Sequence, residues 1–234
     1  MSGKVLGLGV GPGDPELITV KALRLLREAA VVAYPAPENG ASFARAIVAR
    51  WLSPAQREIV IRIPIESARF PAQAVYDEAA RRIAAELEGG SSVAVLCQGD
   101  PFFHGSFMYL FARLAERFPV EVVPGVSSLT ACAAAARWPL AAREDVLIAL
   151  PAALGEQQLK CRLAEVEAAA IIKLGRHFAK VRSVLEALGL AANARYVERA
   201  SLASERVLPL DAVDAASVPY FSMILVHRRG AAWR

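Results

Sequence analysis

Short runs rich in Val, Ile and Leu alternate along this chain with longer segments of Ala, Arg and Glu that have helical periodicity. This alternation is typical of strand-helix-strand units on a mainly parallel sheet. In the first part of the chain it predicts strands at 4–10, 31–34, 58–63, 92–97 and 120–123. The helices expected between them are 17–29, 42–52, 72–87, 105–118 and 127–136.

A second series follows Trp138-Pro139-Leu140 and has more strands. Strands are expected at 146–150, 170–174, 195–198 and 220–227, with a further candidate at 206–210, and helices at 156–167 and 178–188. We therefore expect an α/β protein of two lobes, residues 1–140 with a mainly parallel sheet and residues 141–234 with a mixed one. The length of 234 residues would also permit a single domain.

Composition excludes several classes of protein. With 55% hydrophobic and 21% charged residues, the chain is neither disordered nor collagen-like. Charged residues interrupt every apolar stretch before the roughly 18 residues of a membrane span, and the first residues enter a strand without a secretory signal, so a soluble cytoplasmic protein is expected. Cys97, Cys132 and Cys161 have no zinc or disulfide spacing and are expected to be buried.

The charge balance is mildly basic, with 27 Lys and Arg against 23 Asp and Glu. These basic residues are scattered among the helices and form no stripe with interleaved aromatic residues. The pattern argues against nucleic-acid binding and is compatible with an anionic small molecule.

Three loops rich in Gly, Pro, Asp and Ser follow expected strands, at residues 7–15, 98–101 and 124–128. In an open α/β sheet, ligands bind outside the carboxyl ends of the strands, so the three loops predict one site. Asp14-Pro15 and Asp100-Pro101 also have a purely structural interpretation, as helix caps followed by proline at the first helical position. Both interpretations remain open from the sequence.

A dinucleotide or phosphate site is the obvious rival. After Gly7-x-Gly9 the third glycine position holds Pro12, and after Gly9-x-Gly11 it holds Asp14, so the glycine register fails twice. Carboxylates in these loops favour a ligand that carries an ammonium or hydroxyl groups over a phosphate. A nicotinamide-dependent oxidoreductase or a non-catalytic nucleoside-binding module remains the alternative from another class.

The three loops, with the closing strand at 220–226, resemble the signatures of the S-adenosylmethionine-dependent tetrapyrrole methylases. Residues 105–109, 173–176, 196–200 and 219–222 are similar to the branch that methylates precorrin-2 at C20. The resemblance implies a homodimer with a cofactor cleft between two α/β domains, methyl transfer from S-adenosylmethionine, and a tetrapyrrole as substrate. A cobalt-containing substrate or another ring carbon stays open within the family.

Carried over by position, the resemblance implies a cofactor-binding set: Pro12, Gln98, Gly99, Asp100, Phe103, Ser127, Ser128, Leu174 and Ala200. Uroporphyrinogen-III methylases have Tyr-Asp after the second strand, with the Asp as proposed proton acceptor, whereas this chain has Tyr34-Pro35. The acid-base scheme of that branch therefore does not transfer.

Methyl transfer from a sulfonium is an in-line displacement, in which alignment and exclusion of water are the main tasks of the protein. A base is needed afterwards for the C20 proton, and His104 and Glu66 are the nearest candidates. Arg69, Lys173, Arg176 and Lys180 are candidates for the substrate carboxylates, although a solvated helix face also explains each of them. No bound metal is expected, since no histidine has further ligands nearby in the sequence.

Overall fold

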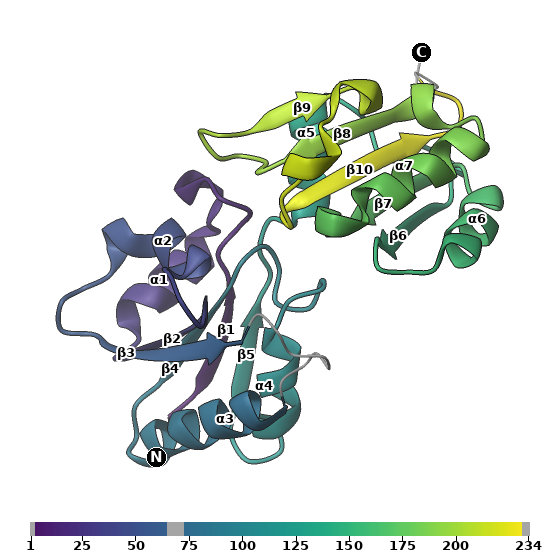
Figure 1. Ribbon diagram of the computed structural model, residues 1–234. Coiled ribbons are helices and arrows are strands. Elements are labelled where there is room, and N and C mark those ends of the chain that lie inside the picture. Colours follow the sequence, from purple (N-terminus) through teal and green to yellow (C-terminus); the bar gives the residue numbers. More distant parts are fainter. Residues whose placement is uncertain (1–2, 65–72, 231–234) are drawn as a thin grey trace. The chain divides into compact units, whose positions relative to one another are not determined.

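The computed structural model describes residues 3–64 and 73–230. The chain forms two compact units, Met1–Ser127 and Ser128–Arg234, each built around one five-stranded sheet (Figure 1). The first sheet is parallel and the second is mixed, which confirms the expected α/β class and the type of each sheet. The division falls before helix α5 (Ser128–Ala136), whereas the sequence analysis placed it after that helix, because α5 contacts strands of the second sheet.

In the first unit, strand order is β3-β2-β4-β1-β5. The strands are β1 (Val5–Gly9), β2 (Val31–Pro37), β3 (Arg57–Ile63), β4 (Val93–Cys97) and β5 (Val120–Val123). The helices are η1 (Pro15–Leu17), α1 (Val20–Glu28), α2 (Phe43–Val48), η2 (Ala49–Trp51), α3 (Gln73–Glu88) and α4 (Phe107–Leu114).

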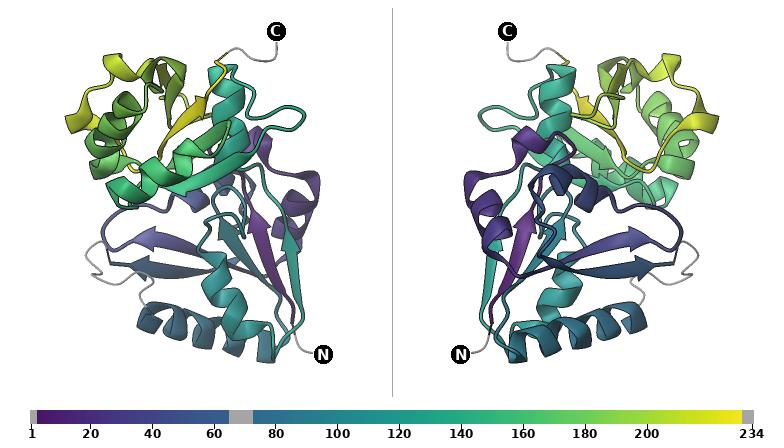
Figure 2. Two further views of the ribbon diagram at one scale, coloured as in Figure 1. Left: turned by 90° about the vertical axis from the view of Figure 1, so that its right-hand side faces the viewer. Right: turned by 90° about the vertical axis from the view of Figure 1, so that its left-hand side faces the viewer.

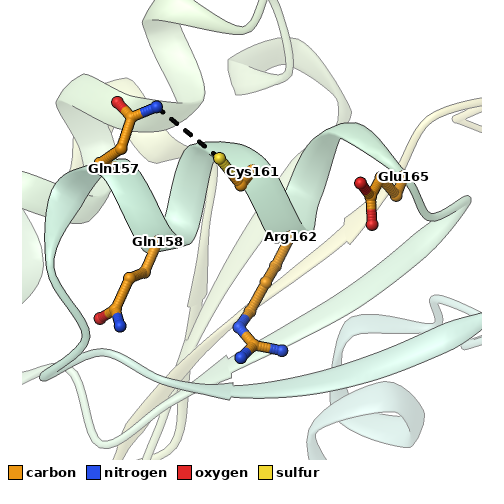
Figure 3. Close-up of a pocket in the computed structure, with 5 residues that line it drawn as sticks. All are labelled: Gln157, Gln158, Cys161, Arg162 and Glu165. Atoms are coloured by element: carbon orange, nitrogen blue, oxygen red, sulfur yellow. Dashed lines mark hydrogen bonds between the residues drawn. The ribbon is translucent and has the colours of Figure 1, made fainter.

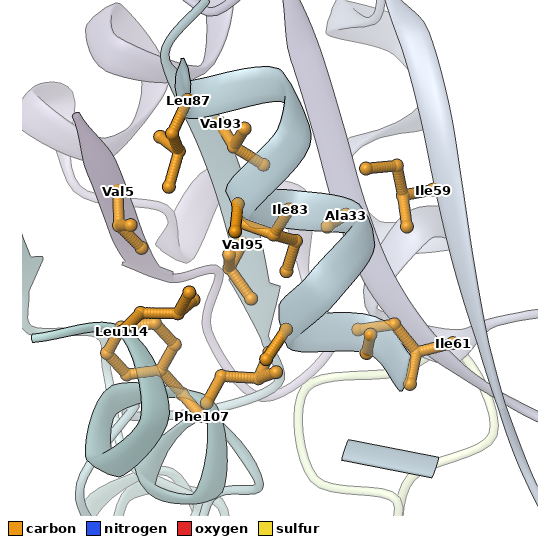
Figure 4. Packing of buried hydrophobic residues seen from close by; sticks show 14 of the residues in the cluster. Val5, Ala33, Ile59, Ile61, Ile83, Leu87, Val93, Val95, Phe107 and Leu114 are labelled. Carbon is orange, nitrogen blue, oxygen red and sulfur yellow. The ribbon is translucent and has the colours of Figure 1, made fainter. Parts of the chain in front are cut away.

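Helices cover both faces of this sheet. Helices α3 and α4 lie side by side on one face, where Val93 and Val95 of β4 pack against Ile83 (Figures 1, 2 and 4). On the other face Ala94 and Leu96 pack with residues of α1 and α2. Because side chains alternate along a strand and both faces are buried, β4 is apolar at every position, as its sequence indicated.

The expected first helix, 17–29, is in fact two elements. Asp14 caps η1 through a hydrogen bond from the Glu16 N–H to its Oδ1 (2.8 Å), which confirms the expected cap, and Pro15 stands at the first helical position. The chain then leaves helical geometry, and the Thr19 hydroxyl caps α1 by accepting from the Ala22 N–H. A second side-chain cap therefore starts the helix three residues later than expected.

Strand β2 extends through two prolines, beyond the expected end at Tyr34. Its pairing with β4 ends at Ala33, so Pro35 and Pro37 lie where β2 is paired with β3 alone. There, one side of the β2 backbone makes no hydrogen bonds to a neighbouring strand. Proline, which has no N–H to donate, can therefore continue the strand. Ser42 closes the next turn, its hydroxyl donating to the Pro35 carbonyl (2.6 Å).

The Tyr34 hydroxyl donates to the Glu58 carboxylate, which Arg45 also binds through two N–H groups at 2.7 and 2.8 Å. Burial and then Glu58 raise the pKa of Tyr34, and the Arg45 hydrogen bonds lower the pKa of Glu58 to about 2. Tyr34 is thus a structural residue that holds β2, β3 and α2 together.

Glu58→Gln is expected to remove part of the acid sensitivity of the fold. Because the pKa of Glu58 in the folded chain is about 2, against 4.5 ordinarily, its stabilisation is present above pH 4.5 and is lost as the pH falls toward 2. The difference in unfolding free energy between wild type and variant should shrink by roughly 1 kcal/mol over this range. The effect is no larger because both charged side chains reach solvent, which screens their interaction. Urea titrations at several pH values measure it. A pH-independent difference would contradict the ion-pair account, and Glu28→Gln in the exposed Arg24 pair is the control.

The second unit has strand order β6-β7-β10-β8-β9, with β10 antiparallel to both of its neighbours. Its strands are β6 (Leu147–Pro151), β7 (Ala168–Ile172), β8 (Ala194–Glu198), β9 (Arg206–Leu208) and β10 (Ser222–His227). Its helices are α5, α6 (Glu156–Ala164), η3 (Gly175–His177), α7 (Phe178–Ala187), η4 (Ala191–Asn193), η5 (Leu210–Ala212) and η6 (Ala215–Ser217). Helices α6 and α7 pack on one face of the sheet, and α5 contacts β8 and β10.

Two of the three cysteines are buried, Cys97 at the end of β4 and Cys132 in α5. The expectation for Cys161 is wrong: it is exposed, because it lies on the outer face of α6. Among residues 3–64 and 73–230, no helix combines the length and the apolar composition needed to cross a bilayer.

Candidate functional site

The loops that follow β1, β4 and β5 meet at one edge of the first sheet, because these strands are parallel neighbours. The first two loops are paired through their backbones: the Gly99 N–H donates to the Gly11 carbonyl (2.7 Å), and the Gly11 N–H donates to the Gly99 carbonyl (3.4 Å). The Val10 N–H donates to the Cys97 carbonyl (2.9 Å). The structure thus brings the three loops together, as the sequence analysis expected.

Glycines let these loops approach each other. A Cβ at Gly9 would lie 2.4 Å from the Gly125 nitrogen, and a Cβ at Gly125 would lie 2.1 Å from the Gly99 carbonyl oxygen. Both distances are far below van der Waals contact, and the neighbouring atoms belong to the backbone. Glycine was expected here for approach to a ligand; at Gly9 and Gly125 the requirement is loop-to-loop contact.

Asp100 joins the loops after β4 and β5. Its Oδ1 accepts from the N–H groups of Phe102 (2.9 Å) and Phe103 (3.1 Å), and its Oδ2 accepts from the N–H of Gly125 (3.1 Å). The carboxylate therefore caps its own loop and also holds a loop from another part of the chain. The expected helix cap is wrong at this motif, because no helix begins at Pro101 and α4 starts only at Phe107. Asp100 instead holds a non-helical turn, and its bond to Gly125 is a long-range contact that the sequence did not predict.

The cofactor-binding set implied by the family resemblance is divided between the two units. In the first unit, Pro12 and Gly99 are buried in the paired loops, and Gln98, Asp100, Phe103 and Ser127 are half-buried around them. In the second unit, Ser128 is the exposed first residue of α5, and Leu174 and Ala200 are buried.

Strand β10 brings Leu174 and Ala200 to one edge of the second sheet. Leu174 follows the end of β7 and Ala200 the end of β8, and β10 lies between these strands and runs the opposite way. The start of β10 binds both segments: the Ser222 carbonyl accepts from the Lys173 (3.1 Å) and Leu174 (3.4 Å) N–H groups, and the Phe221 carbonyl accepts from the Arg199 N–H (3.1 Å).

The backbone at this edge is left-handed at four positions. Lys173 and Gly175 flank Leu174 with φ of 60° and 42°, and Arg199 and Ser201 flank Ala200 with φ of 51° and 66°. Three of the four carry a side chain, which makes the conformation costly, and such backbone strain concentrates at functional sites. Non-glycine residues give no sequence signal for it.

A buried carboxylate supports the Ala200 segment. Glu198 is 3% exposed and accepts from the Tyr196 hydroxyl (2.5 Å), while Arg199 and Arg206 lie 3.5 and 3.4 Å from its Oε1. Burial and then Glu198 raise the pKa of Tyr196. Glu198 was not among the residues predicted from the sequence. The pattern that could have indicated it is its place two residues after Tyr196, which puts both side chains on the same face of the strand.

Residues 4–215 match the profile of the family described as Tetrapyrrole (Corrin/Porphyrin) Methylases. The chain belongs to the tetrapyrrole methylase family. The family match supports methyl transfer and gives no support to the oxidoreductase that the sequence left open.

Relatives within the methylase family agree with the branch that the motifs indicated. A Sinorhizobium protein named precorrin-2 C(20)-methyltransferase is 41% identical, over 96% of this chain and 95% of its own. A Salmonella typhimurium protein named cobalt-precorrin-2 C(20)-methyltransferase is 31% identical over 98% of each chain. The cobalamin biosynthesis protein CobIJ of Mycobacterium bovis is 46% identical over 96% of this chain, which spans only 46% of that protein.

Solved structures of methylases have the same fold. A uroporphyrin-III C-methyl transferase from Thermus thermophilus, complexed with S-adenyl homocysteine, matches with a TM-score of 0.71 and 29% identity over 96% of this chain and 97% of its own. A cobalt precorrin-4 methyltransferase matches with a TM-score of 0.72 at 24% identity, over 96% of this chain and 94% of its own.

Of the two candidate bases, His104 follows the Asp100 loop. It is exposed and left-handed, with φ of 53°, and its ring meets Phe103 edge to face at a centroid distance of 5.2 Å. Glu66 and the substrate candidate Arg69 lie outside the described residues.

The other substrate candidates surround the end of β7. Lys173 and Arg176 lie at the edge that carries Leu174, with Arg176 exposed in η3. The Lys180 ammonium, on α7, donates to the Leu154 carbonyl and so holds α7 against the loop after β6.

A shallow surface hollow in this unit lies on α6, away from the predicted residues. It is lined by residues of one helix and its C-cap, and the Gln157 amide donates to the Cys161 sulfur at 3.7 Å within it (Figure 3). No predicted site residue lines it. In the part of the chain that the structure describes, no three His, Cys, Asp or Glu side chains group in a way that could hold a metal ion.

Proposed function

We propose that this chain transfers a methyl group from S-adenosylmethionine to C20 of precorrin-2, giving precorrin-3A in corrin synthesis. The observation that carries this proposal is the 41% identity to a protein named for that reaction, over nearly the full length of both chains. Two groups of loops, one at an edge of each sheet, contain every residue that the family resemblance assigns to the cofactor apart from Ser128, which begins α5.

The chemistry of these loops fits S-adenosylmethionine. Gln98 and Ser127 offer amide and hydroxyl groups for the ribose and the amino-acid part, and the Phe103 ring offers an apolar face for adenine. The Asp100 carboxylate favours the positive charge of the cofactor. In the second unit, Leu174 and Ala200 are the buried apolar residues that the family resemblance assigns to the cofactor.

When bound, S-adenosylmethionine supplies an electrophilic methyl group on a sulfonium. The residues of this chain then have to orient the ligands and exclude water. Rigid loops help with both tasks. Backbone hydrogen bonds fix the paired loops of the first unit and the left-handed turns of the second.

His104 is our proposed acceptor for the C20 proton. His104 is exposed and its backbone is left-handed, directly after the Asp100 loop. His104→Asn is expected to lower kcat by about 10²-fold with an unchanged KM for S-adenosylmethionine, because a positioned base contributes about that factor. Steady-state kinetics measure it, and an unchanged kcat would remove His104 from the reaction.

The proposed function is tested by incubating the protein with S-adenosylmethionine carrying a labelled methyl group and with precorrin-2, then locating the label by NMR. Label at C20 is expected. Label at another ring carbon would assign the chain to another branch of the family, and the absence of both product and calorimetric S-adenosylhomocysteine binding would refute the proposal.

A cobalt-containing substrate is the second candidate, favoured by the relative that is named for it. Parallel assays with precorrin-2 and cobalt-precorrin-2 decide between them through the ratio of kcat/KM. We expect the metal-free substrate to be preferred, because the relative named for it is the more similar of the two.

We further propose that the protein acts as a homodimer in the cytoplasm, as the family resemblance implies. Light scattering on the purified protein measures its mass in solution, and a monomeric mass at working concentrations would contradict the dimer.

A further inference from the structure

Two neighbouring aromatic side chains are exposed at the edge of the second sheet that carries Leu174 and Ala200. Tyr220 is 54% and Phe221 is 47% exposed, and their rings meet edge to face at a centroid distance of 5.4 Å. Large aromatic side chains usually bury most of their surface, and exposed apolar patches commonly mark binding sites. Neither side chain belongs to the proposed cofactor-binding residues or to the proposed proton acceptor.

The backbone that carries the pair is firmly held. The Pro219 carbonyl accepts from the Gly175 N–H (3.3 Å) and the Ser222 hydroxyl (2.6 Å), and the Phe221 carbonyl accepts from the Arg199 N–H (3.1 Å). The pair is therefore tied to both segments that flank β10, next to Leu174 and Ala200. A preorganised apolar surface costs little entropy when a ligand binds to it.

Positive charge lies over one of the two rings. The Lys173 ammonium is 5.6 Å from the centroid of the Tyr220 ring, and the exposed Arg176 follows in the same turn. The left-handed conformation of Lys173 belongs to the turn that the start of β10 holds through the Ser222 carbonyl. An exposed aromatic pair with an ammonium over one of its rings is complementary to a flat conjugated ring system that bears carboxylates.

We propose that Tyr220 and Phe221 contact the ring system of the tetrapyrrole substrate, and that Lys173 binds one of its carboxylates. This inference rests on the proposed function and specifies where the second unit recognises the substrate. The adenine of the cofactor is the other flat ring that such a surface could take. Lys173 favours the tetrapyrrole, which bears many carboxylates, over adenine, which bears none.

The test compares Tyr220→Ala, Phe221→Ala and Lys173→Gln with wild type in the full-length protein. Uroporphyrin III, a stable polycarboxylate tetrapyrrole, is titrated by fluorescence, and S-adenosylhomocysteine is titrated by calorimetry. Each variant is expected to weaken uroporphyrin binding about fivefold to tenfold, the effect of losing one ring contact or one partly exposed ion pair. The affinity for S-adenosylhomocysteine should stay within about twofold of wild type.

Matched controls lie in the same unit. Val146→Ala removes an exposed apolar side chain that precedes β6, at the opposite edge of the sheet, and Lys160→Gln removes a lysine of α6 that pairs with Glu156. Both should bind uroporphyrin like wild type.

Three results would overturn the inference: unchanged uroporphyrin affinity in all three variants, a parallel loss of S-adenosylhomocysteine affinity, or a changed oligomeric mass as the cause of the loss. The proposed function can fail separately. If the wild type makes no C20-methylated product while the variants still lose tetrapyrrole affinity, the binding surface stands and the reaction has to be reassigned.

Discussion

Asp100→Ala is expected to weaken S-adenosylhomocysteine binding by about a hundredfold and to lower the free energy of unfolding by about 3 kcal/mol. The alanine leaves three backbone N–H groups, those of Phe102, Phe103 and Gly125, without their carboxylate acceptor. The first two shape the loop after β4, and the third fixes the position of the loop after β5. Both loops carry residues proposed to bind the cofactor, so the ligand should sense the change even if it never touches the carboxylate.

Asp14→Ala is the matched control, because Asp14 stands in the same Gly-Asp-Pro context and caps η1 by accepting from Glu16 within its own loop. Loss of such a cap costs about 1 kcal/mol, and the ligand affinity should change less than about threefold. Asp100→Asn separates the two functions of Asp100, since an amide oxygen can still accept from Phe102 and Phe103 while the NH₂ group cannot accept from Gly125. Calorimetry with S-adenosylhomocysteine and urea unfolding measure all three variants. Equal effects of Asp14→Ala and Asp100→Ala on ligand affinity would show that the long-range hydrogen bond from Gly125 to Asp100 does not contribute to ligand binding.

Gly125→Ala should be the most destabilising single methyl addition at this edge, with a cost of about 3 kcal/mol or more. The added Cβ would lie 2.1 Å from the Gly99 carbonyl oxygen and 2.8 Å from two backbone atoms of Gly9. None of these atoms belongs to a flexible side chain, so relief requires the loops after β1, β4 and β5 to separate. Separation breaks the arrangement that we propose for the cofactor.

Gly155→Ala provides the comparison. Gly155 precedes α6 with φ of −62°, and its added Cβ would lie 3.6 Å from the Gln158 side chain, an ordinary contact. Its unfolding free energy should stay within about 1 kcal/mol of wild type. Urea unfolding measures both variants. If Gly125→Ala is recovered only in insoluble form while Gly155→Ala is soluble, the prediction is upheld in its extreme form. A soluble Gly125→Ala with wild-type stability would contradict it.

Local patterns in the sequence were sufficient for the elements and for the class of fold. Alternation of apolar strands with helical segments gave both sheets, and the Gly-Asp-Pro motifs marked the correct strand ends. Boundaries were less accurate where a second signal competed with periodicity. Thr19 caps α1 after a break in the helix. Strand β2 is paired with β4 only as far as Ala33, so it can continue through two prolines.

Helix α5 shows why the extent of each unit was harder to predict. Four of its last five residues are alanine, the fifth being Cys132, so small apolar side chains occur all around the helix and mark no single buried face. The sequence thus carries little information about which sheet α5 covers. The tertiary structure places it with the second unit, where it contacts β8 and β10.

By itself, the sequence determined the α/β class, the two sheets, the three motif loops and the resemblance to the tetrapyrrole methylases, because propensity, periodicity and motif spacing are properties of neighbouring residues. Only the tertiary structure decided which distant residues meet. The order of strands in the first sheet places Gly125 against Gly9 and Gly99, and the antiparallel course of β10 joins the Leu174 and Ala200 segments. The tertiary structure also leaves Tyr220 and Phe221 exposed, with Lys173 over the Tyr220 ring. Strand order and packing between elements fix all of these contacts, and no local pattern encodes them.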